Sequence, residues 1–175
     1  MFVDPNKNIA QLGLHVGMRV ADFGSGTGFY VKAASAHVGN SGKVYAIEVQ
    51  KGMVKRLESE IKQWKLSNVD CIWGDIENIG GTKIAEKSMD AVIISNVLFQ
   101  VEDKLGLIDE AKRILKKQGK VLLIDWKESF GGMGPAPHHV VDEKKARELF
   151  TKRGFKFVEN IAAGDHHYGI IFIYE

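Results

Sequence analysis

The chain has 175 residues, of which 45% are hydrophobic, with a formal net charge of +2 and a single cysteine. This length suits one domain, residues 1–175, that buries roughly 70% of its unfolded surface without disulfides. The small net charge gives no nucleic-acid signal, and the apolar runs are strand-length, which excludes a transmembrane helix. We therefore expect a cytoplasmic protein without a signal peptide.

Apolar periodicity predicts strands that alternate with helices along the chain. Strands are expected at residues 19–23, 43–49, 69–73, 91–95 and 120–126, and helices at residues 6–12, 29–37, 53–64, 105–115 and 143–153. Residues 76–87 are polar and predict at most a short helix. Two final strands, residues 156–161 and 168–174, have no helix between them and should run antiparallel. The alternation predicts a mainly parallel sheet covered on both faces.

Residues 20–28 read VADFGSGTG, an apolar run that ends at Asp22 and is followed by Gly24, Gly26 and Gly28. The pattern predicts a buried strand that turns tightly into a helix. Glycine permits positive φ and lets a ligand approach the bare backbone. The first N–H groups of the following helix are unpaired and attract an anionic group. We interpret this segment as a nucleotide-cofactor turn, with a ligand-free loop as the alternative.

The turn lacks the dinucleotide fingerprint G-x-G-x-x-G, because Phe29 and Val31 stand where its last glycine is required. The Asp22 carboxylate would repel a pyrophosphate and would suit a cofactor with an amino group. S-adenosylmethionine (SAM) offers that amino group, a carboxylate for the helix N-terminus and an adenosine. Glu48 and Asp75 follow the next two strands, and a carboxylate such as Glu48 can accept both ribose hydroxyls.

These motifs resemble those of the class I SAM-dependent methyltransferases, in particular the ubiquinone/menaquinone-type methyltransferase domains. Residues 89–96 resemble the family's fourth-strand motif and residues 115–124 the entry to its fifth strand. The resemblance implies a Rossmann-like, doubly wound α/β fold of seven strands in the order 3-2-1-4-5-7-6, with strand 7 antiparallel. It also implies SAM as cofactor and S-adenosylhomocysteine (SAH) as product. The cofactor-binding residues it implies are Asp22, Gly24, Ser25, Gly26, Gly28, Phe29, Tyr30, Glu48, Val49, Gly74, Asp75, Ile76 and Asn96.

Methyl transfer depends on alignment and desolvation, and it needs a base only when the acceptor must lose a proton. Ligands of open α/β sheets lie beyond the carboxyl ends of the strands, which makes Asn96 and Lys127 catalytic candidates. His138 is the preferred general base, because imidazole titrates near neutral pH, although solvated histidine is the competing interpretation. The histidine pairs at 138–139 and 166–167 lack metal-ligand spacing, so no metal is expected. The glycine-rich loop at residues 130–139 is expected to act as a lid.

We expect a small-molecule acceptor, because no appended domain or strongly basic face is present to hold a polymer. The sequence after the fourth strand is not Asn-Pro-Pro-Tyr, which disfavours an exocyclic amine of DNA. Cys71 is the one cysteine and falls in an expected buried strand, which disfavours cysteine-based arsenite methylation. The alternatives are an RNA or protein methyltransferase that works with a partner, and a SAM-binding protein without catalysis. The oligomeric state is expected to be monomer or homodimer.

Overall fold

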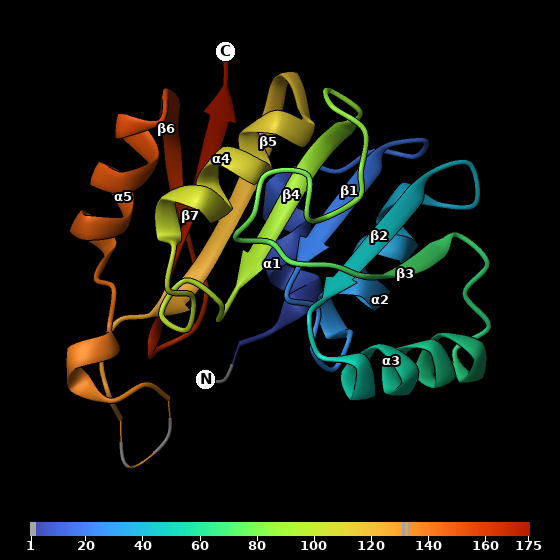
Figure 1. Cartoon of the computed structure of the whole chain (residues 1–175), viewed down its shortest axis with the longest axis horizontal. Coiled ribbons are helices and arrows are strands. Elements are labelled where there is room, and N and C mark those ends of the chain that lie inside the picture. Colours follow the sequence, from blue (N-terminus) through green and yellow to red (C-terminus); the bar gives the residue numbers. More distant parts are fainter. Residues whose placement is uncertain (1–2, 131, 133) are drawn as a thin grey trace.

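The computed structural model describes residues 3–130, 132 and 134–175. In this part of the chain seven strands form one sheet, in the order β3-β2-β1-β4-β5-β7-β6 (Figure 1). Strand β7 pairs antiparallel with β5 and β6, and the other neighbours are parallel. The predicted strand order and the antiparallel seventh strand are confirmed. The strands are β1 (Arg19–Phe23), β2 (Lys43–Glu48), β3 (Val69–Trp73), β4 (Met89–Ser95), β5 (Leu115–Trp126), β6 (Phe155–Ile161) and β7 (His167–Tyr174).

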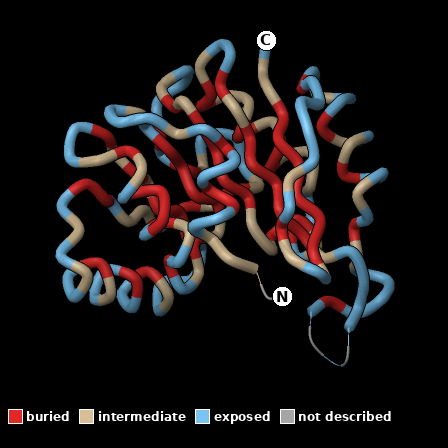
Figure 2. The backbone as a smooth tube through the Cα atoms, turned by 180° about the vertical axis from the view of Figure 1, so that it is seen from behind, coloured by how far each residue is buried: buried red, intermediate tan, exposed pale blue. Residues whose placement is uncertain are grey.

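Helices cover both faces of the sheet, because side chains of each strand alternate between two hydrophobic clusters. Ala21 belongs to the cluster that also holds buried residues of α4 (Lys104–Ile114) and α5 (Glu143–Lys152). Its neighbour Val20 belongs to the cluster with residues of α1 (Pro5–Leu12), α2 (Phe29–Val38) and α3 (Lys51–Gln63). Figure 2 shows the buried strands at the centre and exposed outer turns on the helices.

Helix starts differ in a way that matters for the site. Asp4, Asp103 and Asp142 each accept backbone N–H bonds at the starts of α1, α4 and α5. Helix α2 begins after Gly28, which has a φ of 80° and supplies no side-chain cap. The N–H groups of its first turn are therefore open to an anionic ligand.

The structure departs from the expected element bounds mainly around β5. Strand β4 begins at Met89, and β5 begins at Leu115, directly after α4. Met89 pairs with Leu115 before a shift in register, and Gln118 takes a left-handed φ of 66°. The polar residues that precede the apolar part of β5 hid this early pairing in the sequence. A short 3-10 helix, η1 (Pro137–His139), was not predicted, and residues 76–87 contain no helix.

Candidate active site

The glycine turn is fixed to the neighbouring strand by its backbone. The N–H groups of Gly24 and Ser25 both donate to the Ile47 carbonyl, at 2.9 and 3.0 Å. The N–H of Gly28 donates to the Ser25 carbonyl at 2.8 Å, just before α2 begins. These bonds set the start of α2 beside the carboxyl ends of β1 and β2.

The three glycines of the turn all have positive φ, but they serve different purposes. A β-carbon on Gly24 would lie 2.6 Å from the Val97 side chain, and one on Gly28 would overlap Leu57. A β-carbon on Gly26 would have the Gly24 carbonyl oxygen as its nearest neighbour, at 3.9 Å. Gly24 and Gly28 thus permit close packing of the protein itself, and Gly26 keeps space open for a ligand.

Two carboxylates stand at the ends of the next two strands. Glu48, which is 8% exposed, accepts the N–H of Gly26 at 3.2 Å and the N–H of Gln50 at 3.0 Å. These bonds orient the Glu48 carboxylate and leave each oxygen a further lone pair for a ligand hydroxyl. Asp75 accepts the Glu77 N–H at 2.9 Å and so stabilises its own loop as well.

Asp22 is a buried carboxyl group at the end of β1, with 3% of its surface exposed. The pKa of Asp22 is raised to about 7, mainly by burial and also by the nearby negative charge of Glu48, while a hydrogen bond with Ser25 opposes the rise. Removal from water disfavours the charged form unless a counter-charge is supplied. A cationic group bound here would supply that counter-charge.

Asn96 follows β4 with a left-handed φ of 57°, which is uncommon outside glycine. Its N–H donates to the Ile124 carbonyl at 2.9 Å, and its own carbonyl accepts the Gln100 side-chain N–H at 2.6 Å. The Asn96 Oδ1 atom is buried and has no hydrogen-bond partner among the residues that the structure describes. An orphaned acceptor of this kind is costly without a ligand donor, which indicates a binding role.

Two adjoining cavities open around these groups, and they share Gly24, Gly26, Asn96 and Gln100. The β1-side cavity has a volume of about 540 Å³ and the β2-side cavity about 430 Å³. The β1-side cavity is also lined by Val3, Pro5, Asp22, Ser25, Thr27, Phe29, Tyr30 and Ser95. The β2-side cavity is also lined by Ile47, Glu48, Val49, Gln50, Met53, Gly74, Asp75, Ile76, Glu77, Val97 and Val101.

The donors and acceptors of the paired cavities suit a ligand with three kinds of polar group. Asp22 and the Asn96 Oδ1 atom suit a cationic amine, and the start of α2 suits an anion. Glu48 suits a pair of hydroxyl groups. The open space at Gly26 joins the β1-side cavity to the β2-side cavity.

The structure brings the predicted cofactor-binding residues together at these cavities, with the exception of Gly28, which packs on Leu57. Ser95, Val3 and Pro5 also line the β1-side cavity and were not proposed from the sequence. Ser95 is the last residue of β4 and directly precedes the candidate Asn96, so its position in the sequence was a usable signal. The N-terminal segment reaches the cavity only through the tertiary fold, so no local sequence pattern predicted that Val3 and Pro5 would line it.

Lys127 and His138 lie outside the two sets of lining residues. Lys127 is exposed after β5, and its N–H donates to the His166 carbonyl at 2.9 Å. His138 is exposed on η1, where its ring lies 4.1 Å from that of His139. Gly131 and Met133 of the expected lid lie outside the described residues.

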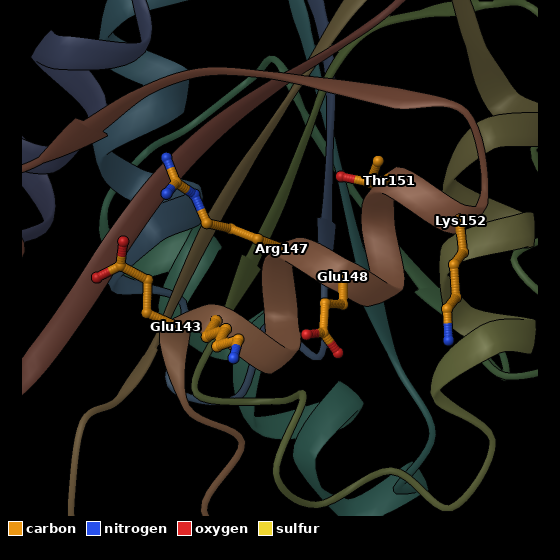
Figure 3. Close-up of a pocket in the computed structure, with 6 residues that line it drawn as sticks. Glu143, Arg147, Glu148, Thr151 and Lys152 are labelled. Atoms are coloured by element: carbon orange, nitrogen blue, oxygen red, sulfur yellow. The ribbon is translucent and has the colours of Figure 1, made fainter.

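Another groove, of about 680 Å³, lies along α5, and Figure 3 draws the residues that line it. Its lining comes from α5 alone and consists of Glu143, Lys144, Arg147, Glu148, Thr151 and Lys152. Neither a strand end nor a glycine turn contributes to it, so we place the candidate site at the two cavities around Gly26. Across residues 3–130, 132 and 134–175, there is no cluster of three or more side chains suited to a metal ion.

Comparison with known proteins shows which family this chain resembles. A family model described as a methyltransferase domain matches residues 14–168. The chain is 35% identical over 112 residues to human arsenite methyltransferase, an alignment that covers 61% of this chain and 30% of that protein. It is 30% identical over 115 residues to the demethylmenaquinone methyltransferase of Geobacillus sp. (strain WCH70), which covers 66% of this chain and 48% of that protein.

A solved SAM-dependent methyltransferase from Aquifex aeolicus is similar over almost the entire fold. The TM-score is 0.91 at 28% sequence identity, and the match covers 99% of this chain and 91% of that chain. By contrast, the alignments reach less than half the length of the human and Geobacillus proteins. No helix in the described part of the chain has the length and apolar character needed to span a membrane.

Proposed function

The chain belongs to the methyltransferase-domain family, whose model spans residues 14–168, and we propose that it methylates a small-molecule acceptor. It is a SAM-dependent methyltransferase, with SAM as its cofactor and an α/β fold of the same strand order as expected. The acceptor, the site residues and the extent of the functional unit are the parts that we propose. We treat residues 1–175 as one domain, in keeping with the single sheet that both hydrophobic clusters share.

The polar groups of the two cavities support a specific orientation of the cofactor. Glu48 would hold the ribose hydroxyls, and the neighbouring walls formed by Val49, Gly74, Asp75 and Ile76 would enclose the adenine. Asp22 and Asn96 would accept hydrogen bonds from the amino group, and the start of α2 would hold the carboxylate.

When bound, SAM supplies a methyl group on a positively charged sulfur, and transfer breaks that sulfur–carbon bond and leaves SAH. The acceptor lone pair forms the new bond to carbon, and an acceptor that carries a proton passes it to a base, for which His138 is the candidate. The chain contributes orientation and exclusion of water through the walls of the two cavities.

The observation that carries the small-molecule proposal is the shape of the β1-side cavity. It extends past the glycine turn to Val3, Pro5, Tyr30 and Ser95, and its volume of about 540 Å³ is typical of small-molecule sites. Demethylmenaquinone and arsenite, named for two relatives, are both small acceptors.

Cys71 bears on which of these two acceptors suits this chain. It lies in β3 and is only partly buried, whereas the sequence had led us to expect a buried position. It lines neither cavity. The cavity walls therefore offer no thiol to hold arsenic, which supports an acceptor other than arsenite.

Asn96 is the catalytic candidate that lines both cavities, and Lys127 and His138 stay predictions. If His138 acts as base from the η1 segment, its ring must approach the β1-side cavity during turnover. Replacement of His138 by alanine then lowers turnover and changes its pH dependence. An unchanged rate and pH profile would remove His138 from the mechanism.

A methyl-transfer assay with labelled SAM tests the proposal against its alternatives. The purified chain is given a panel of quinols, phenols and amines in parallel with bulk RNA. We expect label in at least one small molecule and none in RNA. Label in RNA alone would contradict the small-molecule acceptor, and SAM binding without label anywhere would favour a non-catalytic protein. We further propose a cytoplasmic location and a monomer or homodimer.

A further inference from the structure

One part of the β1-side cavity is not needed for the cofactor orientation proposed above. Val3 and Pro5 reach it from the start of α1, Phe29 and Tyr30 from the start of α2, and Ser95 from the end of β4. We call these five residues the acceptor subsite, and we thereby reassign to the acceptor Phe29 and Tyr30, which the family resemblance had placed with the cofactor. The inference below rests on the proposed function, because it concerns what occupies this subsite beside the cofactor.

The acceptor subsite carries no positive charge among the described residues. Lysine, arginine and histidine are all missing from the described lining of the β1-side cavity, whose one ionisable carboxyl group is Asp22. A second carboxylate, Glu48, lies close enough to influence Asp22. An anionic acceptor would lose its hydration here and would meet no basic side chain in the described lining.

Two hydroxyl groups supply the polar character of the subsite. The Asn8 side chain, which is 1% exposed, donates to the Tyr30 hydroxyl oxygen at 2.8 Å. This bond leaves the Tyr30 proton free to point toward the neighbouring Ser95 side chain or toward a ligand. Burial is the main cause that raises the pKa of Tyr30, so its hydroxyl stays protonated at neutral pH.

Ser95 adds a buried hydroxyl oxygen, Oγ, which lies beside the Tyr30 hydroxyl and makes no well-formed hydrogen bond within the described part of the chain. A buried hydroxyl without a partner costs free energy, which a ligand donor or acceptor would recover. Val3, Pro5 and Phe29 add apolar side chains to the lining of the same cavity. The subsite is therefore apolar and uncharged, with polar atoms at Tyr30 and Ser95.

We infer that the acceptor is a small hydroxyl- or amine-bearing molecule without an anionic group, bound by Tyr30 and Ser95, and that carboxylated acceptors are rejected. Rejection follows from the lack of a basic side chain, and recognition follows from the two hydroxyls. Tyr30 and Ser95 act as specificity-determining residues.

Three related compounds test this selectivity: catechol, its carboxylated form protocatechuate, and the cationic dopamine. The chain is first saturated with SAH, and binding of each compound is then measured by ligand-observed NMR. We expect catechol or dopamine to bind at least about tenfold more tightly than protocatechuate, a ratio that corresponds to about 1.4 kcal/mol. Tyr30→Phe and Ser95→Ala should each weaken that binding.

Two further variants complete the experiment. Val3→Lys places an ammonium group at the subsite and should raise the affinity for protocatechuate about tenfold. Tyr45→Phe is the matched control, because its hydroxyl bonds to Arg19 and it lines neither cavity. This control should bind all three compounds like the parent.

The inference is overturned if protocatechuate binds the SAH-loaded parent as tightly as its two relatives, or if neither catechol nor dopamine binds. Equal binding by Tyr30→Phe, Ser95→Ala and the parent would also overturn the assigned roles. Failure of SAH itself to bind would instead contradict the proposed function, and the inference with it. The SAH titration, which is done first, therefore distinguishes a failure of the proposed function from a failure of this inference.

Discussion

At the scale of single residues, the glycine turn shows why one motif contains several different requirements. Gly24 and Gly28 lie against Val97 and Leu57, whereas a side chain on Gly26 would enter open space. The sequence predicted the turn and its positive φ angles, and it predicted that a side chain on Gly26 would fill ligand space. Only tertiary packing shows that an added β-carbon on Gly24 or Gly28 would instead meet the protein itself.

Gly26→Val should abolish SAM binding, because the added side chain would occupy the space between the two cavities. Calorimetric titration with SAH measures the loss. Gly17→Val is the matched control, since Gly17 also has a positive φ and the nearest atom to an added β-carbon also lies at 3.9 Å, yet Gly17 lines neither cavity. A folded Gly26→Val protein that binds SAH like the control would place the cofactor elsewhere.

Glu48→Ala should weaken SAH binding by about 1.5–3 kcal/mol, the usual value for hydrogen bonds from hydroxyls to a charged group. The exposed Glu58 of α3 provides a control, because Glu58→Ala removes a carboxylate from outside the cavities. Affinities of both variants are compared by calorimetry. Equal affinities would remove Glu48 from the ribose-binding role.

Asp22 gives the site a dependence on pH. Burial raises its folded-state pKa to about 7, so the carboxyl group is largely protonated below that pH. A bound cationic amine favours the carboxylate, and affinity for SAH should therefore rise with pH up to about 7 and level off above it. Below pH 7 the rise should approach tenfold per pH unit. Asp22→Asn should flatten the profile, whereas Asp70→Asn, at an exposed residue of β3, should retain it.

At the scale of elements, the loop after β3 is held in place by α4. Glu110 of α4 is fully buried and accepts the Gly80 N–H at 2.8 Å and the Thr82 hydroxyl at 2.5 Å. Arg113 completes the cluster with a 2.7 Å ion pair to Glu110. This loop begins with Gly74 and Asp75, so α4 helps to position one wall of the β2-side cavity.

Glu110→Ala should lower the free energy of unfolding by about 3 kcal/mol, because it leaves Arg113 without its buried partner. Burial opposes ionisation, but hydrogen bonds from Arg113 and Thr82 lower the pKa of Glu110 overall. The stabilisation is therefore present above the ordinary glutamate pKa and is lost as the pH falls through the lowered value.

Urea unfolding at neutral pH measures this change, with Glu102→Ala as the control at an exposed position of the segment before α4. The control should unfold like the parent. A Glu110→Ala protein as stable as the control would show that the cluster contributes no net stability. Weaker SAH binding by folded Glu110→Ala would support its role in positioning the loop.

At the scale of the whole molecule, the sheet order was predictable because local patterns and family resemblance agreed. Apolar runs identified every strand, and the missing helix between β6 and β7 predicted their antiparallel pairing. The acids Glu48 and Asp75 were predictable because strand ends of a parallel sheet meet at one edge. Val3 was missed, since its contribution depends on where α1 packs against α2, whereas Ser95 was missed although its place at the end of β4 was a usable signal.

The most direct test of this account is a crystal structure of the chain with SAH. We predict adenosine in the β2-side cavity with its ribose hydroxyls on Glu48, and the amine beside Asp22 and Asn96. The carboxylate should lie at the start of α2, with the acceptor subsite still open. SAH bound in the α5 groove, or in the two cavities with its ribose away from Glu48, would contradict the account.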